Sequence, residues 1–420
     1  MPVQPSSASS PAPRANHLIA PPDAASRQRF EAARQAFRGW FVAQAMPLWT
    51  TAGVDLAQGG FAEKLDAQGR PLDEPRRTRV VARQLYVWSV AEPLGWPHDT
   101  SGVVAHGLDF LLHRLLQADG TFASSVTPQG QVVNATFDLY EQAFALFAMA
   151  TVYRRKPQAH ADLLDVSTRL LTVLRQGWGH PVAGFEESRP RTLPLRANPH
   201  MHLFEATLQW AEALRDSQAP NVVQAPWWAL ADELAGLALQ HMVQAPSGLL
   251  TELFDGDWRP MPGDDGRLVE PGHQFEWGWL LIRWGLLRER PDALAAAQHM
   301  VALAEAKGVD AQRGVAINAM DTDGAWRDAH AKLWPQTERI KAWATMASLG
   351  SDTSAVSRSL DHCSAAMSGL MGYLARPLPG AWYESLDAQG GWSPEPVRAS
   401  SLYHIVCALE TACALSLTPA

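Results

Sequence analysis

Apolar residues recur every three or four positions along six long stretches of the chain, a spacing that places them on one side of an α-helix. These stretches are 137–155, 161–177, 202–217, 227–244, 273–290 and 291–308. The stretch 273–290 is apolar on nearly every face, which is typical of a helix buried on all sides, whereas others are clearly amphipathic. Runs of β-branched residues long enough for a large sheet are missing. The pattern therefore predicts an all-α protein with only short β segments.

A short pattern recurs six times between these helices: a small residue, any residue, a bulky apolar residue, any residue and usually an acid. The copies are GGFAE at 59–63, GTFAS at 120–124, AGFEE at 183–187, GLLTE at 248–252, GAWRD at 324–328 and GAWYE at 380–384. Their starts are separated by 61, 63, 65, 76 and 56 residues. Internal repeats at a near-constant spacing indicate a repeated structural unit.

Each unit holds two helices and one short extended segment. Buried helices would form an inner ring and amphipathic helices an outer ring, so six units predict an (α/α)6 toroid with short β segments at one end. An open helical solenoid is the alternative. We favour closure because six units fill a ring and neither end of the chain resembles a polar cap.

Polar residues follow each copy of the pattern, near the start of the expected inner helix. They are Arg83, then Asp138, Tyr140 and Gln142, then His202 and Glu205, then His273 and Glu276, then Trp334, Gln336 and Glu338, and finally Tyr403 and His404. In the toroid these positions would meet at one mouth of the ring. Residues three apart share a helix face, so His202 with Glu205 and His273 with Glu276 are interpreted as the same pair in adjacent repeats. Burying such groups is costly unless they pair or bind a ligand.

Three histidines at one mouth favour proton-transfer chemistry, because imidazole titrates near neutral pH. Glutamates one turn away could hold each ring in one tautomer, and Arg83 offers a fixed cation for an oxyanion. Seventeen tryptophans indicate either a Trp-rich core or a pocket with the flat apolar walls that suit sugars. Such a site could abstract a proton next to a carbonyl and stabilise the enediolate, as in a sugar isomerase or epimerase.

Three other functions fit parts of this pattern. Two histidines and two glutamates could ligate a metal, but carboxylate-bridged helical sites use the reverse order, Glu-x-x-His, and His200 and His202 do not share a helix face. A glycoside hydrolase or lyase would use two of Glu205, Glu276 and Glu338, yet it does not require three histidines. A sugar-binding module would explain the aromatic residues but not the bases. We therefore expect an enzyme with no metal and no other cofactor.

The composition of the chain limits the possible ligands and the cellular compartment. The net charge of −8 and the lack of a basic block argue against nucleic-acid binding, and no run of eighteen apolar residues predicts a membrane span. Three cysteines, an odd number without a CxxC pair, favour a reducing cytoplasm. Residues 1–25, rich in Pro, Ser and Ala, are expected to form a disordered tail, and residues 26–420 a single catalytic domain. The expected partner is a monosaccharide, and the chain is expected to be a monomer or homodimer.

Several strings of this chain resemble the N-acylglucosamine 2-epimerase superfamily, which includes mannose isomerases, sulfoquinovose isomerases and cellobiose 2-epimerases. The strings are GGFAEKLDAQGRP, RTRVVARQLYVWS, LYEQAFALFA, NPHMHLFEA, PGHQFEWGWLL, LWPQTERIKA and ASSLYHI, and the resemblance spans roughly residues 40–410. It implies an (α/α)6 barrel and acid–base catalysis without a metal.

The resemblance also implies roles for individual residues. His273 and His404 are expected to be the acid–base pair, and His202 to assist ring opening or proton transfer. Glu276 is expected to orient His273, and Arg83 to bind the O1/O2 end of the substrate. The expected substrate-binding residues are Glu205, Trp334, Glu338, Tyr140 and Asp138.

Within this superfamily we expect an aldose–ketose isomerase, such as one that converts D-mannose to D-fructose or D-lyxose to D-xylulose. One histidine would take the C2 proton of the open sugar, and return of the proton to C1 of the cis-enediolate would give the ketose. A sugar 2-epimerase of the N-acylglucosamine or cellobiose type is the alternative. It would use the same histidines on opposite faces of the enediolate.

Overall fold

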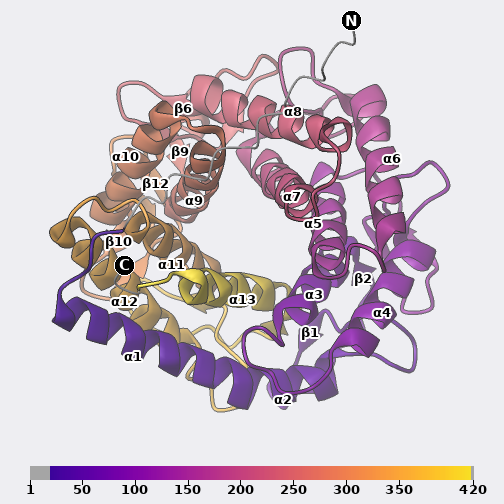
Figure 1. Ribbon diagram of the computed structural model, residues 1–420, viewed down its shortest axis with the longest axis horizontal. Coiled ribbons are helices and arrows are strands. Elements are labelled where there is room, and N and C mark those ends of the chain that lie inside the picture. The colour runs from indigo at the N-terminus through magenta and orange to yellow at the C-terminus, as the bar shows by residue number, and fades with distance from the viewer. Residues whose placement is uncertain (1–18, 418–420) are drawn as a thin grey trace, which may run out of the picture.

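The computed structural model describes residues 19–417, and its long helices form two concentric rings around a central axis (Figure 1). The inner helices are α3 (Thr78–Val90), α5 (Leu139–Arg155), α7 (Ala197–Asp216), α9 (Pro271–Arg288), α11 (Leu333–Ala347) and α13 (Ala399–Ala414). The outer helices are α1 (Ala24–Trp40), α4 (Ser101–Phe110), α6 (Ala161–Trp178), α8 (Asn221–Leu237), α10 (Pro291–Gly308) and α12 (Thr353–Tyr373). The predicted (α/α)6 architecture is confirmed.

Three outer helices continue beyond their α-helical part. Helix α1 runs on through a π-helical turn (Phe41–Ala45), the short α2 (Met46–Leu48) and a second π-helical turn (Trp49–Gly53). Single π-helical turns also extend α4 and α8, over Leu111–Leu115 and Ala238–Met242.

The inner ring is closed. Each inner helix packs against the next one along the chain, and α13 packs back against α3. Strand β1 (Lys64–Leu65) of the first repeat pairs with β16 (Val397–Arg398) of the last, which joins the two ends of the repeat array. An open solenoid has no contact between its first and last units, so that alternative is wrong.

Burial separates the two rings as the hydrophobic pattern predicted. Nearly every residue of α9 from Pro271 to Gly285 is buried, whereas α10 buries only the side that faces the inner ring. The expected helix at 291–308 is confirmed at both ends. The expected helix at 227–244 is wrong at its start, since α8 begins at Asn221 and carries Pro226 within its second turn. Proline usually marks the start or a break of a helix, and for this reason the expected helix left out residues 221–226.

At one end of the ring, short antiparallel strands of neighbouring repeats pair with one another. Besides β1–β16, the inter-repeat pairs are β2 (Arg76–Arg77) with β3 (Ser125–Val126), β5 (Leu195–Arg196) with β8 (Leu253–Phe254), β9 (Leu268–Val269) with β12 (Ala319–Asp321), and β14 (Ala331–Lys332) with β15 (Ser385–Leu386). Within repeats, β4 (Val132–Asn134) adds to β3, β6 (Val243–Gln244) pairs with β7 (Leu249–Leu250), β10 (Val309–Asp310) with β11 (Val315–Ala316), and β13 (Trp326–Asp328) with β12. A single 3-10 turn spans Asp265–Arg267.

The structure corrects the fifth copy of the repeat. The side-chain amide of Gln142 accepts from the backbone N–H of the bulky residue of copy two and donates to its backbone oxygen. Gln274 makes the same two hydrogen bonds to the bulky residue of copy four, and Gln336 makes them to Ala316. The fifth copy is therefore 314–318, GVAIN, and not 324–328, which belongs to the hairpin β12–β13. The turn glycine of copy five is Gly314, with a φ of 72°.

The ordered barrel begins slightly earlier than predicted. Of the expected tail, residues 1–18 lie outside the described residues, while Ile19 and Ala20 pack against the core and α1 begins at Ala24. In residues 19–417, none of the helices combines the length and the apolar character needed to cross a membrane. The three cysteines of this part of the chain are free thiols, and Cys363 and Cys407 are buried.

Candidate active site

Six residues form a layer across the inner ring because each lies six positions beyond the residue that caps its helix. They are Arg83 in α3, Phe144 in α5, His202 in α7, Glu276 in α9, Glu338 in α11 and His404 in α13. His273 lies three positions after its cap, one turn closer to the strand-bearing end. His202 is thus level with Glu276, and the interpretation of His202/Glu205 and His273/Glu276 as equivalent pairs is wrong.

A cavity of about 360 Å³ opens above this layer. His202, His273 and His404 all line it, as do Arg83, Tyr140, Trp334 and Glu276. Trp334 lies between two of the histidines, with its ring centroid 4.9 Å from that of His273 and 6.1 Å from that of His404. The Trp334 ring packs directly against the backbone of Gly272. A Cβ atom at position 272 would lie 2.5 Å from this ring, so only glycine leaves room for the indole.

Each histidine has a carboxylate at its Nδ1 atom. Glu338 lies 2.9 Å from Nδ1 of His404, and Glu205 lies 3.2 Å from Nδ1 of His202. The partner of His273 is Glu252, at 2.9 Å. A carboxylate at Nδ1 fixes the ring orientation and leaves Nε2 for the substrate. The expectation that Glu276 orients His273 is wrong: its Oε1 atom lies 3.9 Å from Nδ1 of His202 and 3.6 Å from Nζ of Lys341.

The surroundings of His273 and His404 drive their pKa values in opposite directions. Burial acts to lower the pKa of His273, but the carboxylates of Glu252 and Glu270 outweigh it and raise the pKa to about 10. Burial lowers the pKa of His404 well below its ordinary value, and the cations Arg83 and Lys341 lower it further. At neutral pH the cavity therefore holds one protonated imidazole and one neutral imidazole, the states of an acid and a base.

Buried charges form the floor of the cavity. The ammonium group of Lys341, which is fully buried, is paired with Glu338, lies near Glu276 and sits 3.9 Å from the centre of the Trp279 ring. Burial opposes ionisation of Glu205, yet His202 and Lys341 hold its pKa at about 2. Burial raises the pKa of Glu276 and of Glu338 to about 7. Lys341 is the cation that makes this cluster of acids possible.

A second, larger cavity of about 780 Å³ lies on the other side of this floor. Glu205, Trp279 and Cys407 line it, and they belong to a deeper layer of the inner ring, nine positions beyond the helix caps. Glu205 therefore acts on the cavity that the three histidines line only through its contact with His202. The role predicted for Glu205 in substrate binding stays a prediction.

Arg83 is held on one wall of the cavity by aromatic rings. Its Nη2 atom donates to the hydroxyl of Tyr140 at 2.8 Å, and its guanidinium lies 4.2 Å from the centre of the Phe144 ring. The buried Nε–H of Arg83 has no partner among the described residues. Because an unmet buried donor is costly, this group is suited to bind a substrate oxygen.

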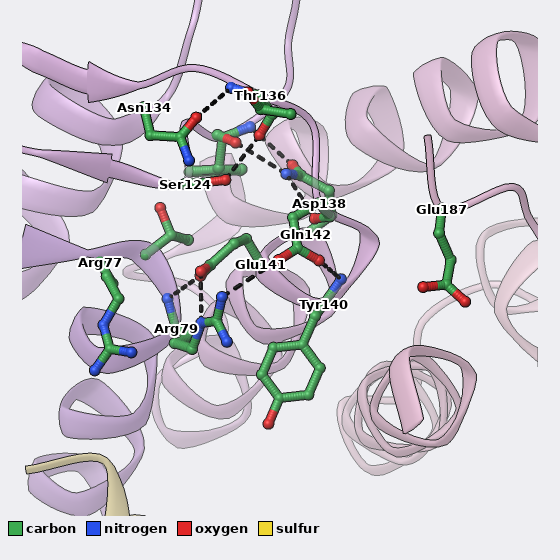
Figure 2. Close-up of polar contacts among 12 residues, drawn as sticks. Arg77, Arg79, Ser124, Asn134, Thr136, Asp138, Tyr140, Glu141, Gln142 and Glu187 are labelled. Atoms are coloured by element: carbon green, nitrogen blue, oxygen red, sulfur yellow. Dashed lines mark hydrogen bonds and ion pairs between the residues drawn. The ribbon is translucent and has the colours of Figure 1, made fainter. Parts of the chain in front are cut away.

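Asp138 lies outside the cavity wall in the structure. Figure 2 shows it at the start of α5, where its carboxylate accepts from the backbone N–H of Tyr140 at 2.9 Å and pairs with Arg79 at 3.3 Å. Arg79 also pairs with the buried Glu141, 2.5 Å away. This cluster fixes the start of α5 and so the place of Tyr140, whereas substrate binding by Asp138 stays a prediction.

Two groups of three side chains in this floor have the ligand types that could hold a metal ion. They are His202 with Glu205 and Glu276, and Glu276 with Glu338 and His404, in each of which the ligand atoms lie within 4.8 Å of one another. Both groups include Glu276, beside which the ammonium of Lys341 already lies. A divalent cation there would be placed against a fixed positive charge, which is electrostatically unfavourable.

His200 has a structural role. It is buried, and its Nε2 lies 3.1 Å from both the backbone nitrogen and the oxygen of Phe185. His200 stands four positions after its helix cap, as Gln142, Gln274 and Gln336 do in their own repeats. Its Nδ1–H donates to the backbone oxygen of Arg196 at 3.1 Å, so that Nε2 accepts from the backbone N–H of Phe185. Burial lowers the pKa of His200 to about 4, so the ring is neutral.

We therefore expect His200→Gln to retain activity within about twofold, because a glutamine at this position of the other repeats accepts from the same backbone N–H and also donates to the backbone oxygen. A steady-state assay with a thermal melt checks this expectation. A loss of activity comparable to that of a catalytic variant, with the melting temperature unchanged, would contradict it.

Glu252 and Lys341 are residues of this site that the sequence pattern does not reveal as such. In the sequence Glu252 is only the acid of the fourth repeat copy, and its contact with His273 follows from the path of the loop between β7 and β8. Lys341 stands three residues after Glu338, a spacing that does place both on one helix face. A lysine among the buried residues of an inner helix, one turn after a glutamate, is the signal that the sequence offers.

Comparison with known proteins places this site in context. The model of the N-acylglucosamine 2-epimerase (GlcNAc 2-epimerase) family matches residues 59–408. The chain is 38% identical over 371 residues to a mannose-6-phosphate isomerase of Rhizobium meliloti (strain 1021), covering 88% of this chain and 94% of that protein. It is 26% identical over 273 residues to a D-mannose isomerase of Pseudomonas cannabina pv. alisalensis, covering 61% of this chain and 62% of that protein. The structure of cellobiose 2-epimerase from Spirochaeta thermophila DSM 6192 superposes with a TM-score of 0.79 at 22% identity, covering 93% of this chain and 98% of that one.

Proposed function

The chain belongs to the N-acylglucosamine 2-epimerase family and is a sugar isomerase or epimerase, and from this we propose that it interconverts an aldose and its ketose, with D-mannose and D-fructose as the pair. The observation that carries the proposal is the cavity in which a protonated His273 and a neutral His404 flank Trp334 beside Arg83. Two relatives named as mannose and mannose-6-phosphate isomerases favour this pair over a pair of C2 epimers.

In the proposed mechanism, His404 is the base. Its free Nε2 takes the proton from C2 of the open-chain aldose, while His273 gives its Nε2 proton to O1, so that a cis-enediol forms. His404 then returns its proton to C1, and His273 recovers a proton from O2, which leaves the ketose and both histidines in their starting states. Arg83 binds O1 and O2 and stabilises the charge that develops on them. His202 assists opening of the sugar ring.

Epimerisation is the second candidate, favoured by the structural likeness to a cellobiose 2-epimerase. In that reaction His273 would keep its proton while Arg83 stabilises the enediolate, and would then give the proton to C2 from the opposite face. Exchange with solvent would return both histidines to their starting protonation states. The two reactions differ in the carbon that is protonated and in the histidine that supplies the proton.

The substrate could also carry a phosphate, as the name of the relative with 38% identity suggests. Lys332 lines the cavity and is exposed, and its positive charge acts on the neighbouring Glu270. The ammonium group of Lys332 would bind a phosphate at C6 of the sugar. The ratio of kcat/KM for mannose 6-phosphate to that for mannose therefore decides between a phosphorylated and a free substrate.

The test is incubation of the enzyme in D2O with mannose, mannose 6-phosphate, lyxose, N-acetylglucosamine and cellobiose, each followed by NMR. We expect mannose to give fructose, with deuterium at C1 in the molecules for which the proton on His404 exchanges with D2O before it is returned. Deuterium at C2 of an epimer would establish epimerisation instead, and no turnover of any of these sugars would overturn the proposal. Treatment with EDTA is expected to leave the rate unchanged, and a rate restored only by added metal would contradict the metal-free mechanism.

A further inference from the structure

We propose that Glu252 is a positioning residue for the reaction: its carboxylate holds Nδ1 of His273 and thereby directs Nε2 of that ring at the substrate. The inference rests on the proposed role of His273 in the site. It assigns to the acid of the fourth repeat a task that its counterparts in the other repeats do not have.

The acid of the repeat normally anchors the inner helix that follows it. Glu63, Glu187 and Glu384 each accept a hydrogen bond from the backbone N–H of the residue that caps the next inner helix, at 2.7, 2.6 and 2.7 Å. Asn318 does the same in the fifth repeat, at 2.9 Å. Each bond satisfies a backbone donor at the end of a helix. The shared task of these residues is therefore structural.

In the fourth repeat the residue that caps the inner helix differs from those of the other repeats. In the first and third repeats the capping residue is an arginine, and its side chain occupies the second carboxylate oxygen of Glu63 or Glu187. In the fourth repeat the capping residue is Glu270, whose carboxylate side chain cannot donate a hydrogen bond to Glu252. The backbone bond from Glu270 to Glu252 is also long, at 3.3 Å. The Oε2 atom of Glu252 is left free for another donor.

His273 takes that oxygen because of its place on α9. It lies three positions after the cap, and Ser401, three positions after the cap of α13, donates to Glu384 in the same way. The contact of Glu252 with His273 is therefore an existing geometry of the repeat in which serine is replaced by imidazole. Glu252 is 5% exposed, so the bond is shielded from water.

Other charged groups around the His273 ring come from three elements. Glu270 lies 3.7 Å from Nδ1, Glu276 follows one turn later on α9, and Lys332 and His404 line the cavity from β14 and α13. Glu252 is the group in direct hydrogen-bond contact with Nδ1. Its loss would free the ring to rotate and would remove the main charge that keeps it protonated.

The test compares Glu252→Gln with a matched control, Glu187→Gln. Both substitutions remove one carboxylate charge at the same repeat position and weaken the same kind of helix anchor, but Glu187 contacts Arg196 and not a histidine of the site. We expect Glu252→Gln to lower kcat by about 10- to 100-fold with KM changed less than about threefold, because an acid–base group loses its orientation. The alkaline limb of the kcat profile should move to lower pH, since the His273 proton is held less tightly.

Two further variants and a measurement without substrate separate a positioning role of Glu252 from a purely structural one. Glu187→Gln should retain kcat within about twofold at a similar melting temperature, and Glu252→Asp should recover part of the lost rate by restoring the charge. NMR titration of the His273 ring in the substrate-free protein should show a lower pKa in Glu252→Gln. An unshifted His273 titration with kcat equal to that of Glu187→Gln would overturn the proposal. A wild-type protein that turns over no sugar, yet shows the shifted titration, would overturn the proposed function and leave the contact between Glu252 and His273 standing.

Discussion

His404→Ala is expected to lower turnover by about 1,000-fold or more, because it removes the proposed base. The remaining groups could bind the sugar but could not take the C2 proton, so exchange of that proton with D2O should stop along with isomerisation. Glu338 keeps its ion pair with Lys341 in this variant, and the barrel should therefore remain folded. The measurement is steady-state kinetics and C2 exchange by NMR, with a thermal melt.

The control for this variant is His299→Ala, which removes an exposed imidazole from the outer helix α10. It should retain the full rate. If His404→Ala kept more than about a tenth of the wild-type rate, His404 would not be the base, since acid–base groups contribute about 100- to 10,000-fold.

Lys341→Met is expected to cause a large loss of stability, of about 3–5 kcal/mol, because it leaves buried carboxylates without their cation. Methionine fills a similar volume, so the effect would report mainly on charge. Without Lys341, Glu276 and Glu338 should take up protons more readily, and their pKa values should rise above the present value of about 7.

This loss should grow with pH. A carboxyl group whose pKa is higher in the folded than in the unfolded protein contributes less stability as the pH rises through its folded pKa. The melting temperature of Lys341→Met should thus lie further below that of the wild type at pH 8.5 than at pH 6. The double variant Lys341→Met/Glu338→Gln, which removes both charges, should regain part of the loss. Equal melting temperatures for the single variant and the wild type would refute this role of Lys341.

The candidate site could be located from sequence because its residues break the apolar pattern of inner helices. His202, His273 and His404 stood out in this way, and the structure brings all three to one cavity. Their partners could not be assigned from spacing alone. Glu276 shares a helix face with His273, yet Glu252, twenty-one residues away, makes the hydrogen bond.

The sequence by itself determined the helical repeats, the sixfold number and the family, since periodicity and short motifs are local properties of the chain. Only the tertiary structure decided that the fifth copy begins at Gly314, that His202 is level with Glu276, and that Lys341 neutralises the floor of the site. These features depend on how far each helix is shifted along the ring axis. That shift is set by strand pairing and by bonds such as that from Gln336 to Ala316, which join residues of different elements and leave little trace in any single stretch of sequence.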